Sequence, residues 1–146
     1  MIEDEYLNLL RHFHAEGVEY VVVGGHVVIA HGFPRTTGDL DLLVSPTWSN
    51  AGRVGRALEC FGYTRGEFEE ADFTKAPNFL SSSARGVWID LMTSVLEIEF
   101  EEAAADALEP LFADVPVCYI GLAALRATKL ATGRPQDLRD LENLPG

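Results

Sequence analysis

The sequence predicts a single domain of the α/β or α+β class, in which helices pack on a mixed β-sheet to form a sandwich. Two observations predict it. The chain has 146 residues, a length typical of one domain. Segments with helical spacing of apolar residues alternate along it with short β-branched runs, and this alternation is typical of helices packed on a sheet. We therefore expect residues 1–146 to form one domain.

The first half of the chain alternates between helical and extended patterns. Apolar residues such as Leu9, Leu10 and Phe13 recur at helical spacing, whereas the run before Gly24 is rich in valine. Polar and glycine-containing segments separate these runs and indicate turns. The sequence predicts helix over about 3–16, strand over 19–24, a short helix over 26–31, strand over 39–44, and helix ending near Phe61.

The second half continues the alternation but has a less regular start. Phenylalanines between Tyr63 and Arg85 are scattered among Gly, Pro and Ser, so we expect a loop with one or two short strands there. Beyond it the periodicity is clearer. We expect strand over 86–92, helix over 100–111, strand over 115–120, and two helices over 122–132 and 135–144 separated by Gly133.

Composition excludes several classes of function. The formal net charge of −12 disfavours a broad nucleic-acid surface, since such surfaces neutralise many phosphates with Lys and Arg. The longest apolar run, Val18 to Ala30, is interrupted by Glu19, two glycines and His26, so no membrane span is expected. Three acids precede residue 6 where a signal peptide would carry bases, and the two cysteines lack paired spacing. We expect a cytoplasmic protein with reduced thiols.

The negative charge is concentrated in one stretch, residues 97–114. It carries seven acids, and neither Lys nor Arg occurs between Arg85 and Arg126. A solvated surface explains most such runs, and a docking face for a basic protein partner is the alternative.

Two carboxylates are predicted to point to the same place on one strand. In Asp39-Leu40-Asp41 the period of a strand puts both aspartates on one face and Leu40 on the other. Like charges this close repel, and a cation between them relieves the repulsion. Oxygen ligands without competing sulfur or imidazole suit Mg²⁺ or Mn²⁺. The alternative is a strand end with two solvated acids.

Asp90 is a third candidate for the same site. It interrupts the apolar run Val87 to Met92, where a lone carboxylate is costly unless it is paired or binds metal. A third acid beside the first two can complete a site for metal-assisted phosphoryl transfer. A salt-bridged or edge-exposed aspartate is the alternative.

Glycines at a strand end form the last feature of the pattern. Gly24-Gly25 follows a predicted strand and precedes a predicted helix, so unhindered backbone amides could face a phosphate. The segment is neither a dinucleotide-binding fingerprint nor a P-loop. The alternative is a tight turn that needs glycine only for its backbone, and this alternative would be favoured without the aspartates downstream.

Taken together, these residues resemble a known superfamily. Val23-Gly24-Gly25, then Pro34-Arg35-Thr36-Thr37-Gly38-Asp39-Leu40-Asp41, then Asp90 on a later strand resemble the DNA polymerase beta-like nucleotidyltransferases. The closing segment, Lys129 to Leu141, is similar to the branch that contains AbiEii-type toxins and small nucleotidyltransferases. The resemblance spans about 18–144 and implies the minimal nucleotidyltransferase fold.

The resemblance also implies roles for individual residues. Gly24 and Gly25 are expected at the triphosphate, Asp39 and Asp41 as metal ligands, and Asp90 as a metal ligand and the acid that activates the acceptor hydroxyl. Lys129 matches a basic position near the phosphates. One departure is Gln136, where relatives often carry a Lys. The separate helical substrate domain of the family has no room in this chain.

Several basic and polar residues have two interpretations. Arg35, Thr36 and Thr37 either contact phosphate or stabilise the turn before the strand that carries Asp39 and Asp41. Lys129 and Arg134 either bind the triphosphate or interact with the dipole at a helix end. Asp137 and Asp140, in the first turns of the last helix, are expected to serve capping and ion pairs.

The sequence therefore favours a metal-dependent transfer of a nucleoside monophosphate from a nucleoside triphosphate to a hydroxyl acceptor, which could be a small molecule, an RNA end or a protein. The intact aspartates favour this enzyme. The rival is a non-catalytic module of a toxin-antitoxin-like pair that retains the fold and uses its acidic face for a partner. The missing acceptor domain favours the rival.

Overall fold

The computed structural model describes residues 4–24, 39–64, 66, 68–75, 79–95 and 98–144. The short helix expected over 26–31 lies outside this part of the chain. The helices are α1 (Asp4–Glu16), α3 (Trp48–Phe61), α4 (Phe100–Ala104), α5 (Leu122–Thr132), α6 (Pro135–Asn143) and the short 3₁₀ helix η2 (Glu70–Phe73). The strands are β1 (Tyr20–Val23), β2 (Leu40–Val44), β3 (Phe79–Ala84), β4 (Val87–Met92), β5 (Ser94–Val95), β6 (Ile98–Glu99), β7 (Leu111–Phe112) and β8 (Val115–Pro116).

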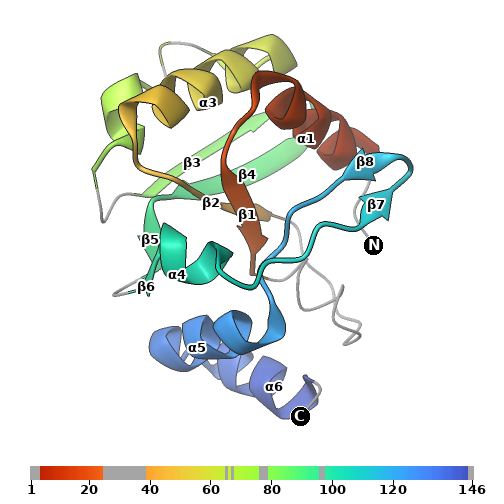
Figure 1. Ribbon diagram of the computed structural model, residues 1–146, viewed down its shortest axis with the longest axis vertical. Coiled ribbons are helices and arrows are strands. Elements are labelled where there is room, and N and C mark those ends of the chain that lie inside the picture. Colours follow the sequence, from red (N-terminus) through yellow and green to blue (C-terminus); the bar gives the residue numbers. More distant parts are fainter. Residues whose placement is uncertain are drawn as a thin grey trace.

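A mixed four-stranded sheet with the order β1-β2-β4-β3 is the centre of the fold. The pairs β1–β2 and β3–β4 are antiparallel, whereas the middle pair β2–β4 is parallel. Helices α1 and α3 lie side by side over one face of the sheet. Helices α5 and α6 lie beyond the C-terminal end of β1 (Figure 1). This is the helix-covered mixed sheet that the sequence predicts.

The hydrophobic core lies between the sheet and helices α1 and α3. Along β4 the side chains of Val87, Ile89 and Leu91 are buried. Leu40 and Leu42, the partners of Ile89 and Leu91 in β2, are equally buried. The helices contribute apolar residues at the spacing expected from the sequence: Leu9, Leu10, Phe13, Val54, Leu58 and Phe61. Since strand side chains alternate between faces, Asp41 and Asp90 must lie on the other face of the sheet.

Local signals determine where α3 begins and ends. The Thr47 side chain accepts a hydrogen bond from the Asn50 backbone N–H, which makes Thr47 the N-cap of the helix. Gly62 ends the helix at a φ of 124°. Inside α3, the buried Asn50 side chain bonds to Glu19 and Ser45 and so joins the helix to the ends of β1 and β2.

Two predictions about the second half are wrong in part. The helix expected over 100–111 ends at Ala104, and Leu111 belongs instead to a small hairpin with β8. Leu108 pairs with Tyr119 in an antiparallel bridge instead of continuing the helix. Pro110 also disfavours helix in the residue before it, so helix cannot extend through to Leu111. The strand expected over 115–120 is regular only at 115–116, and Tyr119 then forms a parallel bridge to Val22 beside β1.

The chain shows no helix, within its described residues, that is both long and apolar enough to cross a membrane.

Candidate active site

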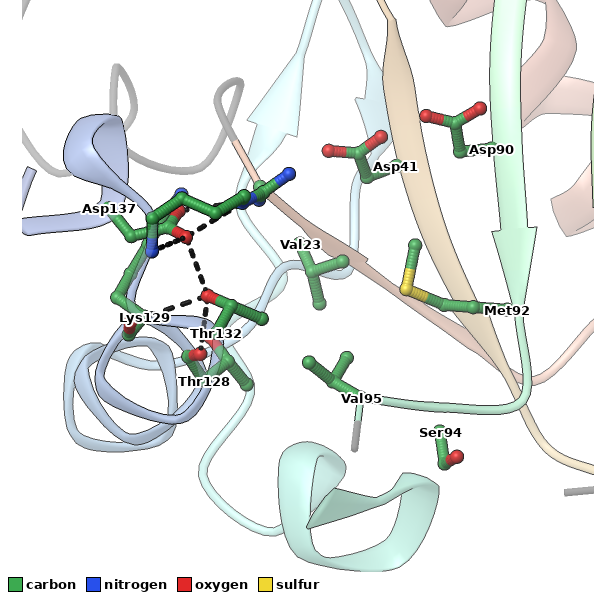
Figure 2. Close-up of a pocket in the computed structure, with 12 residues that line it drawn as sticks. Val23, Asp41, Asp90, Met92, Ser94, Val95, Thr128, Lys129, Thr132 and Asp137 are labelled. Atoms are coloured by element: carbon green, nitrogen blue, oxygen red, sulfur yellow. Dashed lines mark hydrogen bonds and ion pairs between the residues drawn. The ribbon is translucent and has the colours of Figure 1, made fainter. Parts of the chain in front are cut away.

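The acidic side of the site is built on neighbouring strands. Asp41 of β2 and Asp90 of β4 are direct partners in the parallel ladder, and Val23 of β1 is the partner of Asp41 on its other side. Figure 2 shows the two carboxylates next to each other at one end of a pocket. Their position follows from the alternation of the strands, because Leu40, Leu42, Ile89 and Leu91 fill the core on the opposite face.

Burial and neighbouring carboxylates raise the pKa values of Asp39 and Asp41. Burial, hydrogen bonding and repulsion from Asp90, and repulsion from Asp39, raise the pKa of Asp41 to about 7, and only Lys129 acts in the other direction. Burial and the proximity of Asp90 also raise the pKa of Asp39, which stands exposed just before β2. The structure thus brings all three predicted acids together, with Asp90 next to both others.

Gly24 allows the backbone to pass Asp41 at very short range. A Cβ on Gly24 would lie 1.9 Å from Asp41 Oδ2, and the residue has a φ of +78°, which favours glycine. Glycine is therefore required here for two separate reasons. Gly25, Arg35 and Thr37, which the sequence also places at the site, lie outside the described residues.

The pocket between the acids and the C-terminal helices has a volume of about 420 Å³. Asp41 and Asp90 form one wall, and the opposite wall holds Thr128, Lys129, Thr132 and Asp137 (Figure 2). Gly24, which adjoins Asp41, and Arg134, which pairs with Asp137, also line the pocket. Val23, Met92, Ser94 and Val95 line the remainder. This volume is within the range of small-molecule sites.

Lys129 lies inside a network of charges on the far wall. Its ammonium is 3.3 Å from Asp137 Oδ1 and 3.0 Å from Asp140 Oδ2, and only 6% of its side chain is exposed. Gln136 donates to the other oxygen of Asp140 at 2.8 Å. Lys129 therefore neutralises buried carboxylates at the edge of the pocket, and Asp137 and Asp140 form the ion pairs that the sequence predicts.

Asp137 also holds Arg134 in place. The Arg134 Nε donates to Asp137 Oδ2 at 2.8 Å and Nη2 donates to Oδ1 at 3.3 Å, while the Arg134 backbone N–H and the Thr132 hydroxyl bond to the same carboxylate. Burial opposes the ionisation of Asp137, but these hydrogen bonds and the charge of Lys129 together lower its pKa well below the usual range. Asp137 thus stays ionised and fixes the guanidinium at the start of α6.

Arg134 is the more accessible cation of this wall. Its side chain is 73% exposed, and the pair with Asp137 uses only two of the five guanidinium N–H groups. The remaining donors are available to a ligand in the pocket. A fixed guanidinium with spare donors is well suited to bind phosphate oxygens.

The carboxylates fit an open cation site better than a closed one. Among the residues that the structure describes, no three carboxylate, imidazole or thiol side chains enclose a metal position by themselves. Mg²⁺ commonly binds one or two carboxylates and takes its other ligands from water and substrate phosphates. Asp41 and Asp90, with a raised pKa at Asp41 and a pocket in front of them, fit that pattern.

Sequence reasoning missed one residue that contacts an acid of the site. Ser81 of β3 donates a hydrogen bond from its hydroxyl to Asp90 Oδ1 at 2.6 Å. It lies in the segment that the sequence predicts least clearly, where three consecutive serines give a weak strand signal. The Arg85-Gly86 pair was a sequence signal for a tight turn between two strands. Both residues have positive φ and close the β3–β4 hairpin, which pairs Ser81 with Asp90.

Comparisons with known proteins relate this fold to nucleotidyltransferases. A protein from Thermotoga maritima that is assigned as a nucleotidyltransferase superposes with a TM-score of 0.67 and 18% identity, over 97% of this chain and 93% of that one. The aminoglycoside nucleotidyltransferase ANT(2″)-Ia, solved in complex with adenylyl-2″-tobramycin, superposes with a TM-score of 0.61 and 15% identity, over 93% of this chain and 85% of that one. No family model and no curated protein matches the sequence. The chain therefore has the nucleotidyltransferase fold.

Proposed function

We propose that this protein is a metal-dependent nucleotidyltransferase, which moves a nucleoside monophosphate from a nucleoside triphosphate to a hydroxyl acceptor and releases pyrophosphate. One observation carries the proposal: Asp41 and Asp90, in direct register on parallel strands, face a pocket whose other wall presents Arg134. An acid pair opposite a fixed cation is the arrangement that a metal-bound polyphosphate requires. The names of both structural neighbours support the same activity.

The donor side of the reaction involves the two pocket walls. Asp39, Asp41 and Asp90 are the residues that would hold Mg²⁺ or Mn²⁺, and such ions supply positive charge to the phosphates when bound. Gly24 lines the same pocket, and its lack of a side chain leaves the Asp41 carboxylate unobstructed for a metal-bound phosphate. Arg134 donates to the triphosphate from the other wall, and Asp137 keeps its guanidinium in position.

On the acceptor side, Asp90 accepts the proton of the attacking hydroxyl. It is the carboxylate of the pair that lies farther from β1 and next to β3, since the strand order is β1-β2-β4-β3. An acceptor can approach from the β3 side while the triphosphate occupies the pocket. A hydroxyl acceptor agrees with the adenylylated compound bound to ANT(2″)-Ia.

Incubation of the purified protein with each labelled nucleoside triphosphate and Mg²⁺ or Mn²⁺, with and without cell extract, tests the activity. We expect transfer that requires the divalent ion and is lost in Asp41→Asn and in Asp90→Asn. Equal transfer by wild type and by the variants of Asp39, Asp41 and Asp90 would contradict the assignment of the acid site.

A second function, binding of a basic protein partner, has one observation in its favour. The acidic stretch is exposed at Glu99, Glu101 and Glu102, and it also exposes Leu108 and Leu111 at 45% and 66%. Acids beside exposed leucines are typical of an interaction surface rather than of a purely solvated face. In a toxin-antitoxin-like module of this kind, the folded protein would transfer no nucleotide, and the incubation above separates the two functions.

A further inference from the structure

The hydroxyl of Ser81 stands where an acceptor hydroxyl would have to stand. Ser81 is the direct partner of Asp90 in the antiparallel β3–β4 ladder, and Asp90 is the direct partner of Asp41 in the parallel β2–β4 ladder. The three side chains therefore form one row across the same face of the sheet. Ser81 is exposed to solvent at the end of this row.

The contact between Ser81 and Asp90 has the geometry of a nucleophile and its base. The Ser81 Oγ to Asp90 Oδ1 distance is 2.6 Å, with the hydroxyl as donor. A general base must lie within about 2.6–3.2 Å of the oxygen whose proton it takes. The proposed function gives Asp90 this role toward an acceptor, and Ser81 already occupies the matching position.

We propose that the protein transfers a nucleoside monophosphate to its own Ser81 when no external acceptor is present. This inference rests on the proposed function, because it uses the same triphosphate site. Ser81 Oγ forms the new bond to the α-phosphorus, the bond from the α-phosphorus to the bridging oxygen breaks, and pyrophosphate leaves with that electron pair. The hydroxyl proton passes to Asp90. The product is a serine phosphodiester, and no oxidant or other reactant is needed.

The two threonine hydroxyls among the described residues that line the pocket are engaged elsewhere. Thr132 donates to Asp137 at 2.7 Å, on the wall opposite the acids, and Thr128 donates to the backbone carbonyl of Leu125 at 2.8 Å. Ser83 lies two residues from Ser81 on the same face of β3 and is also exposed, but its ladder partner is Trp88 instead of Asp90. Ser83 is therefore a matched control.

The modification limits itself to one nucleotide per chain. After transfer, Ser81 has no proton to donate, and the phosphodiester adds a negative charge beside Asp90, Asp41 and Asp39. The triphosphate, itself an anion, then meets greater repulsion in the pocket. We expect incorporation to reach a plateau at or below one nucleotide per chain, and modified protein to bind triphosphate more weakly than unmodified protein.

Intact mass spectrometry of the full chain tests the inference. The protein is incubated with each of the four nucleoside triphosphates and Mg²⁺ or Mn²⁺, without other acceptor, and then digested and mapped. We expect a mass increase of one nucleoside monophosphate on the peptide that contains Ser81, which a phosphodiesterase removes. Ser81→Ala should lose the adduct, Ser83→Ala should keep it, and Asp90→Asn should lose it.

Calorimetry with the same triphosphate separates the failure of this inference from the failure of the proposed function. Ser81→Ala should bind the metal-bound triphosphate with an affinity within about threefold of wild type, because the hydroxyl is not a ligand of the phosphates. If wild type binds triphosphate with the metal but stays unmodified at Ser81, or if the adduct lies on another residue, this inference is overturned and the proposed function stands. If no triphosphate binds with metal at millimolar concentration, both are overturned.

Discussion

Lys129 and Asp140 form an ion pair of 3.0 Å whose two side chains are almost completely removed from solvent, at 6% and 0% exposure. Asp137 shares the same ammonium. Removal of one member of a buried ion pair typically costs about 3–5 kcal/mol, because it leaves an uncompensated buried charge. In this cluster Lys129 compensates two carboxylates at once, so its first contribution is to stability.

Lys129→Ala should lower the free energy of unfolding by about 3–5 kcal/mol, as measured by urea denaturation. The control is Arg139→Ala, which removes an exposed cation of α6 and should change the free energy of unfolding by no more than about 0.5 kcal/mol. An equal, small effect of both substitutions would show that the buried cluster does not form.

Arg134→Gln should act mainly on the ligand. Arg134 lines the pocket with a largely exposed side chain, and hydrogen bonds to a charged group are worth about 1.5–3 kcal/mol, so triphosphate affinity should fall roughly ten- to a hundredfold. Monophosphate affinity should change much less. Calorimetry with both nucleotides in Mg²⁺ measures the difference, with Arg139→Gln as control. Loss of stability with unchanged triphosphate affinity would restrict Arg134 to helix capping.

Gly24→Ala and Gly86→Ala form a matched pair. The two glycines have φ values of +78° and +79°, so alanine should cost each about 1–2 kcal/mol of backbone strain. Only at Gly24 does the new Cβ meet a side chain, Asp41 Oδ2 at 1.9 Å, whereas nothing lies within 4 Å at Gly86. Metal-dependent triphosphate binding should fall at least tenfold in Gly24→Ala and stay unchanged in Gly86→Ala. Equal affinities in the two variants would separate Gly24 from the site.

Asp41→Asn should stabilise the metal-free protein above neutral pH. Because the pKa of Asp41 is raised from 3.8 to about 7, the folded protein binds this proton more tightly than the unfolded chain does, and stability falls as the pH rises from about 4 to 7. The asparagine variant lacks this decrease. Its melting temperature should exceed that of wild type at pH 8, and the two should converge near pH 4.

Added Mg²⁺ or Mn²⁺ at pH 8 should raise the melting temperature of wild type but not of Asp41→Asn, since binding to the folded state alone stabilises it. Glu142→Gln, at an exposed carboxylate of α6, is the control and should follow wild type in both measurements. A metal response that survives in the asparagine variant would show that the ion binds elsewhere.

The helices and the central strands were predictable because their patterns are local. The apolar spacing in α1 and α3 and the alternation around Asp41 and Asp90 follow from periodicity alone, and the structure confirms the elements that carry them. The proximity of Asp41 to Asp90 was inferred from a resemblance, since no local pattern determines which strands pair. The short hairpins β5–β6 and β7–β8 contain too few residues to show a period.

The state of Lys129 could not be predicted from its neighbours in the chain. Its burial depends on how α6 folds back after Gly133, which brings Asp137 and Asp140 to the same ammonium. The sequence offered only a choice between a helix-end cation and a phosphate ligand. Ser81 was missed for a similar reason, because its contact with Asp90 depends on the register of the β3–β4 hairpin.

The parallel pairing of β2 with β4 also has a consequence for the order of folding. A two-residue turn joins β3 to β4, so that hairpin needs only local contacts, whereas β2 reaches β4 only after the chain has closed a long loop containing α3 and β3. Long-range closure is slower than local closure. The repulsion between Asp41 and Asp90 therefore opposes the docking of a preformed hairpin rather than its formation. Refolding in the presence of a divalent ion should accelerate this late step.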